Sequence, residues 1–217
     1  MKETKINSDL KKYIEKEIFP LYTQNDEGHN LKHIKYVINR CLKFASQFPN
    51  INLDMLYTVA AFHDLAHHID KDKHEVLSAQ IFYENEKMTE FFSPEERLLM
   101  KEAIIDHRAS LEYVPRNDYG KILSSADRST NISELIRRTH AYSCTHYPHM
   151  TTIEMIDRAY NHMIKKYGIE GYAPIYCKDP AYEKFKKEVN HYKEDKKEFI
   201  KKYREVNKMV ELKSKHS

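Results

Sequence analysis

His63 and Asp64 lie in the stretch AAFHDLAHH, directly after a strongly apolar run of the chain. Burying a carboxylate among apolar residues costs free energy unless a partner compensates its charge. A metal ion would compensate it, and an imidazole beside a carboxylate suits Mn, Fe, Co, Ni or Zn better than Ca. His67 lies three residues after Asp64 and would share its face if the stretch is helical. The stretch therefore indicates a site for a divalent transition metal, with Mg also possible.

Further candidates stand at the borders of other apolar segments, namely His33, His74, His107 and Asp127. Each of them alone would more commonly be a surface residue or an ordinary hydrogen-bonded residue. As an ordered set beside helices that can face one another, they are harder to explain without a shared site. Arg108 and Arg128 directly follow His107 and Asp127, and a guanidinium binds phosphate oxygens in a bidentate way. A surface ion pair is a nearly equal interpretation of either arginine.

The composition favours helices and narrows the list of partners. Only 4 glycines and 7 prolines interrupt the 217 residues. The net charge of +3 is too small to indicate nucleic-acid binding, and no apolar run is long enough to span a membrane. The N-terminus lacks an apolar signal region, and the three cysteines are widely spaced. We therefore expect a cytoplasmic protein with no nucleic-acid or membrane partner.

Apolar periodicity and capping residues predict helices over residues 8–19, 31–48, 53–68, 70–87, 93–107, 120–142, 151–167 and 179–210. Ser93 and Thr151 each begin a capping box, which is a strong helix-start signal. The last helix carries an apolar stripe of Phe185, Val189, Tyr192, Phe199, Tyr203, Val206 and Val210. We expect this stripe to pack on its own chain rather than form a dimer seam, and both monomer and homodimer stay open.

The series His33, His63-Asp64 and Asp127 resembles the pattern of the HD-domain superfamily of metal-dependent phosphohydrolases. The contexts HIKYV, AAFHDLAHH and SSADR are similar to the ligand helices of that family, and the resemblance covers roughly residues 25–145. It implies that His33, His63, Asp64 and Asp127 are the metal ligands.

The same resemblance implies an all-α fold, a single helical HD-domain-like bundle with an appended long C-terminal helix. We expect an N-terminal helix in residues 1–24 and the metal-binding phosphohydrolase core in residues 25–145. Residues 146–217 are expected to form a helical extension packed on that core.

Members of the family that bind two ions have additional histidines between the His-Asp pair and the last aspartate. His74 and His107 stand at corresponding places, so one ion or two is possible. We favour one ion, because only Asp64 is a strong candidate to bridge two. His67, His74 and His107 would then hold water or substrate phosphate and move protons near neutral pH.

These residues together predict a phosphohydrolase that cleaves a phosphoester or phosphoanhydride of a small phosphorylated substrate, with a nucleotide as the first choice, by metal-activated water. The substrate stays open, because LAHHID lacks the acidic residues that relatives acting on the stringent-response nucleotide carry soon after the pair. The Gly-Tyr-Pro signature of cyclic di-nucleotide phosphodiesterases is absent as well. The alternative is a non-catalytic, regulatory helical protein that binds a metal or a nucleotide.

Overall fold

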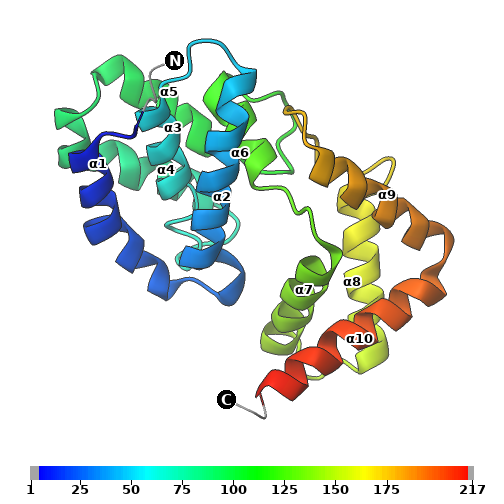
Figure 1. Ribbon diagram of the computed structural model, residues 1–217. Coiled ribbons are helices and arrows are strands. Elements are labelled where there is room, and N and C mark those ends of the chain that lie inside the picture. Colours follow the sequence, from blue (N-terminus) through cyan, green and yellow to red (C-terminus); the bar gives the residue numbers. More distant parts are fainter. Residues whose placement is uncertain (1–4, 215–217) are drawn as a thin grey trace. The chain divides into compact units, whose positions relative to one another are not determined.

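The computed structural model describes residues 5–214, without the side chains of residues 27 and 209–214. The described range is helical and contains no strand, which confirms the predicted all-α class (Figure 1). The chain forms two compact units. The first runs to Arg128 and includes Ile175–Lys178, and the second holds Ser129–Pro174 and the chain from Asp179 onward. This division differs from the expected boundary at residue 145, and the packing of residues 146–217 on the core stays a prediction.

The first unit contains the helices that carry the candidate ligands. It begins with α1, which continues as a π-helical turn at Ile14–Ile18 and a 3-10 turn at Phe19–Gln24. Another 3-10 turn, Glu27–His29, precedes the second helix. The α-helices of the unit are α1 (Ser8–Tyr13), α2 (Leu31–Phe44), α3 (Leu53–Phe62), α4 (His74–Glu84), α5 (Pro94–Ile105) and α6 (Asp118–Ala126).

Helix α3 is the centre of this unit. It starts where the sequence predicts, because the Asn52 side chain accepts hydrogen bonds from the backbone N–H groups of Asp54 and Met55. Every residue from Met55 to His67 is buried, and α3 contacts α2, α4, α5 and α6. A helix that is apolar on all sides must be surrounded in this way.

The predicted continuation of α3 to residue 68 is wrong, because the helix ends at Phe62 and turns follow. In a helix the Asp64 carbonyl would accept a hydrogen bond from the His68 N–H. The Asn25 side chain takes both positions instead, donating to the Asp64 carbonyl over 2.8 Å and accepting from the His68 N–H over 3.1 Å. A side chain from a distant segment therefore stops the helix at the His-Asp pair.

The single helix predicted over residues 120–142 is also wrong, because it is divided into α6 and α7 (Ile132–His146). The guanidinium of Arg40, in α2, donates to the carbonyls of Ala126 and Arg128 over 2.5 and 2.6 Å. The Asn131 side chain caps the start of α7 by accepting from the Glu134 N–H. The break places Asp127 at the end of α6, where its side chain can reach the other candidate ligands.

The second unit consists of α7, α8 (Thr152–Tyr167), α9 (Pro180–Glu194) and α10 (Lys196–Ser214), which contact one another. The long final helix is interrupted at Asp195, whose carboxylate accepts from the N–H groups of Lys197 and Glu198 and restarts the helix. The expected apolar stripe is buried from Phe185 to Val206, while the Val210 side chain lies outside the described residues. None of the described helices is long and apolar enough to cross a membrane.

Candidate metal centre

The candidate ligands come from the ends of five helices of the first unit. His63 and Asp64 follow α3, His107 follows α5 and Asp127 follows α6. His33 lies in the first turn of α2, and His74 is the first residue of α4. Helix ends allow side chains from several directions to meet at one point, so residues 94 positions apart in sequence become neighbours.

Asp64 is the central residue of the cluster. Its Oδ2 atom lies 3.2 Å from His63 Nε2 and 3.7 Å from His33 Nε2. Its Oδ1 atom lies 3.3 Å from His74 Nε2 and 3.4 Å from His107 Nε2. The potential ligand atoms of each of these two groups lie within 4.8 Å of one another. One carboxylate therefore faces two pairs of histidines, and the number of ions that the site holds stays a prediction.

Asp127 joins the first group through His33, whose Nε2 atom lies 3.1 Å from Asp127 Oδ1. Burial alone would raise the pKa of the Asp127 carboxyl, but its interaction with His33 holds that pKa well below its usual range. All four residues that the sequence predicts as ligands are thus brought together.

Three of the histidines have the same orientation. In each, Nδ1 donates to the backbone carbonyl three residues earlier, over 2.9 Å in His63, 2.8 Å in His74 and 2.6 Å in His107. A carbonyl can only accept, so Nδ1 carries the proton and Nε2 of the neutral ring presents a lone pair. This is the tautomer that a metal-binding histidine uses when its second nitrogen is held by a backbone carbonyl.

The Nε2 atoms of His74 and His107 face each other at 3.2 Å. With both Nδ1 protons donated elsewhere, two neutral rings would bring their lone pairs into contact, which is unfavourable without a positive charge between them. The buried His63 Nε2 is a related case, because it makes no hydrogen bond of good geometry within the described part of the chain. These three nitrogens are suited to a bound cation.

The pKa values of the cluster describe its charge without a metal. Burial would raise the pKa of Asp64, but the charge of His63, followed by the contact with His107, holds it well below its usual range. Burial would lower the pKa of His63, but the charge of Asp64 raises it to about 9. At His74 the interaction with Asp64 outweighs burial and raises the pKa, whereas burial dominates at His107 and lowers it. A proton on His63 therefore balances part of the carboxylate charge, and a divalent cation would take its place.

Several supporting residues were not predicted from the sequence. Asn25 and Arg40 fix the two chain breaks next to Asp64 and Asp127, and the Ser78 hydroxyl accepts from the Ala66 N–H over 3.0 Å. A signal for Arg40 was present, because it lies seven residues after His33 and therefore on the same face of α2. The sequence offers no comparable signal for Asn25 or Ser78.

Two arginines, Arg108 and Arg128, were considered from the sequence as phosphate-binding residues beside the metal. Arg108 donates to the Asp72 carbonyl over 2.6 Å and lies 3.2 Å from a Glu75 carboxylate oxygen, which favours the ion-pair interpretation. Arg128, the other arginine considered for phosphate binding, is only 1% exposed and donates to the Ser124 hydroxyl over 2.5 Å. Its guanidinium lies 3.8 Å from the Asp127 carboxylate.

His67 lies beside the cluster, with its ring 5.2 Å from that of His74. A helix would give His67 the same face as Asp64, but residues 63–69 form turns. Its Nδ1 atom instead faces Asp26 at 3.7 Å, and its ring stacks on His29. Asp26 and His29 were missed, although their types and spacing in the polar segment TQNDEGHN were a usable signal. Burial, followed by the charge of His29, lowers the pKa of His67 to about 4.

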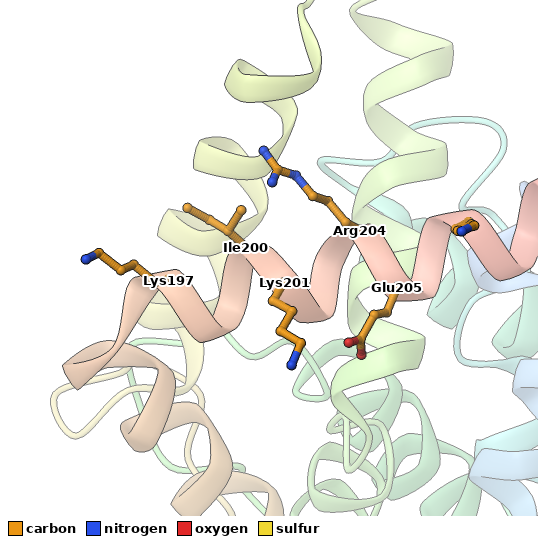
Figure 2. Close-up of a pocket in the computed structure, with 6 residues that line it drawn as sticks. Lys197, Ile200, Lys201, Arg204 and Glu205 are labelled. Carbon is orange, nitrogen blue, oxygen red and sulfur yellow. The ribbon is translucent and has the colours of Figure 1, made fainter.

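A surface hollow of the second unit lies along α10, and its lining residues differ from those of the candidate metal centre. Figure 2 shows its lining, which consists of Lys197, Ile200, Lys201, Arg204, Glu205 and Lys208. These side chains belong to one helical face and include none of the candidate ligands. We therefore interpret it as the solvated face of α10 and place the chemistry at Asp64.

Among solved structures, the chain is similar to the crystal structure of a predicted HD superfamily hydrolase from an uncultured Thermotogales bacterium. The two chains are 21% identical, the match covers 72% of this chain and 93% of that one, and the TM-score is 0.45. No protein-family model matches the chain, and no curated protein sequence matches it. A function is therefore argued from the geometry of the site.

Proposed function

We propose that this protein is a metal-dependent hydrolase, and more particularly a phosphohydrolase of the HD type that holds two divalent ions. One observation carries the proposal, namely that each oxygen of the buried Asp64 carboxylate faces two histidine Nε2 atoms. Carboxylates that bridge in this way, with imidazoles completing each side, suit Mn, Fe, Co, Ni or Zn.

The residues divide between two neighbouring positions. His33, His63 and Asp127 would hold one ion together with Asp64, and His74 and His107 would hold the other. Such ions, when bound, lower the pKa of water and polarise a phosphoryl oxygen. The backbone carbonyls that hold Nδ1 of three histidines keep their rings oriented before any ion binds, which reduces the reorganisation that binding requires.

The substrate class that fits is a small phosphorylated molecule, with a nucleotide as the first choice. A phosphate group brings negative charge to the site, and two divalent ions, which displace the histidine protons and outweigh the charges of Asp64 and Asp127, supply the excess positive charge. Arg108 is paired with Glu75, so we assign it to fixing the start of α4, where His74 lies. The proton-transfer role predicted for His67 stays a prediction.

A screen of nucleotides and generic phosphoesters with Mn²⁺, Co²⁺, Ni²⁺ and Mg²⁺, read by released phosphate or pyrophosphate, tests the proposal. We expect turnover of at least one phosphoester, and its loss in Asp64→Ala. His149→Ala is the matched control, because His149 is exposed and belongs to the second unit. Metal binding without hydrolysis of any phosphoester would instead support the non-catalytic alternative.

A further inference from the structure

We propose that Asp26, His29 and His67 form a third divalent-cation site, beside the two positions that share Asp64. Two imidazoles and a carboxylate are a donor set for Zn, Co, Mn, Fe or Ni rather than for Ca. The potential ligand atoms of the three residues all lie within 4.8 Å of one another. This cluster is separate from the Asp64 groups, since it shares no residue with either.

The cluster is built by a tight turn. Asp26 caps the 3-10 turn Glu27–His29, and its Oδ1 atom accepts from the N–H groups of Gly28 and His29 over 2.8 and 3.1 Å. The same oxygen lies 2.8 Å from His29 Nδ1, while Oδ2 faces His67 Nδ1 at 3.7 Å. The backbone therefore fixes one oxygen of the carboxylate and directs the other toward the second imidazole.

The two imidazoles are held face to face, with ring centroids 3.5 Å apart and an interplanar angle of 21°. Asn25 holds the two segments at this separation, because its amide donates to the carbonyls of both His29 and Asp64. The in-plane lone pairs of two parallel rings do not converge, so an ion bound to all three side chains would require one imidazole to turn about its Cβ–Cγ bond. The geometry thus brings two imidazoles to one carboxylate from segments 38 residues apart.

Exposure distinguishes this cluster from the cluster around Asp64, which we call the inner site. The side chains of Asp26, His29 and His67 are 42%, 25% and 10% exposed, whereas Asp64 is 3% exposed. Three protein ligands on an open side leave coordination positions for water or for an incoming ligand, as in metal sites that exchange ligands. We therefore infer an exchangeable ion that binds less tightly than the inner pair.

The position of the cluster gives this ion a role. The His67 ring lies 5.2 Å from His74, and the His29 ring lies 5.9 Å from His33, so the cluster borders both inner positions. An ion there would neutralise part of the charge of a polyphosphate substrate, a task that the buried Arg128 and the Glu75-paired Arg108 are poorly placed to perform. This role rests on the proposed function and is an alternative to the predicted proton transfer by His67, whereas binding of the ion does not depend on it.

The experiment counts ions on the full-length chain. Protein stripped by a chelator is titrated with Co²⁺, and bound cobalt is measured by elemental analysis and by its visible absorption bands. We expect three ions on the wild type, and two on His29→Ala and on Asp26→Asn, which keeps the turn cap. Asp64→Ala should retain the outer ion. His149→Ala, the exposed control, should bind three.

An ion count on both His29→Ala and Asp26→Asn equal to that of the wild type would overturn the outer site, as would an Asp64→Ala variant that binds no ion. Loss of all ions from either variant, with an unchanged thermal melting curve, would overturn it too, because the cluster would then be part of the inner site. Failure of the proposed hydrolysis is read separately, from phosphate release by wild-type protein loaded with metal.

Discussion

Arg40 is the residue through which we expect α2 to control the position of Asp127. Its guanidinium is 8% exposed and donates to the carbonyls of Ala126 and Arg128, on either side of the ligand. It also lies over the rings of Tyr36 and Phe44, 5.5 and 5.2 Å from their centroids. Arg40→Met keeps an unbranched side chain that can fill part of the space but removes the donors and the charge.

The magnitude follows from these contacts. Each carbonyl left without a donor in a buried place costs about 1–3 kcal/mol, so two cost about 2–6 kcal/mol. Loss of the ring contacts adds about 0.5–1 kcal/mol. We therefore expect the free energy of unfolding of the first unit to fall by about 4 kcal/mol. Because Asp127 loses its orientation, metal affinity should fall by about 10–100-fold.

Urea unfolding followed by circular dichroism, and titration of the stripped protein with Zn²⁺, measure the two effects. Arg97→Met is the matched control, because Arg97 reaches one carbonyl at 3.5 Å and lies over Tyr83, so it should cost less than about 1 kcal/mol. A loss below about 1 kcal/mol in Arg40→Met, or an unchanged affinity for Zn²⁺, would refute this account of Arg40.

Three further predictions concern other parts of the chain. Asp106 is fully buried and accepts hydrogen bonds from the Arg116 guanidinium and from the Tyr113 hydroxyl. Asp106→Asn should therefore lower the free energy of unfolding, measured with urea, by about 2–4 kcal/mol. It should also weaken binding of the ion beside His107, measured by Zn²⁺ titration. Burial lowers the pKa of His162 from 6.5 to about 4. Between pH 4 and pH 6.5 His162 is protonated in the unfolded chain but not in the folded chain. The free energy of unfolding should therefore fall as the pH falls from 6.5 to 4, by at most about 3 kcal/mol. His162→Gln should reduce that loss in urea unfolding at pH 5 compared with pH 7, and an equal loss in both proteins would exclude this histidine as the cause. Ser93 caps α5 in a complete capping box, so Ser93→Ala should cost about 1 kcal/mol in the same assay, and no measurable change would contradict the capping argument.

Local signals were sufficient for most of the helices. Capping residues and apolar spacing act within a few residues, so the starts of α3, α5, α8 and α9 could be predicted from the chain alone. The breaks could not, because their causes lie elsewhere in sequence. Asn25 ends α3 from 39 residues away, and Arg40 holds the end of α6 from 86 residues away.

The candidate site shows the same limit. Residue types and order were enough to nominate the residues that meet at Asp64, because their combination is unusual beside apolar segments. The number of ions was not accessible, since it depends on which oxygen of Asp64 each histidine faces. Arg128 was misplaced for a similar reason, because its position after Asp127 does not reveal that its guanidinium is buried against Ser124.

The central claim is that Asp64 bridges two divalent ions. Anomalous X-ray diffraction from crystals grown with Mn²⁺ or Zn²⁺ tests it most directly. We predict two peaks about 3.5–4 Å apart, one beside each oxygen of the Asp64 carboxylate, with His33 and His63 at one and His74 and His107 at the other. A single peak, or no peak within about 2.5 Å of Asp64, would contradict the claim.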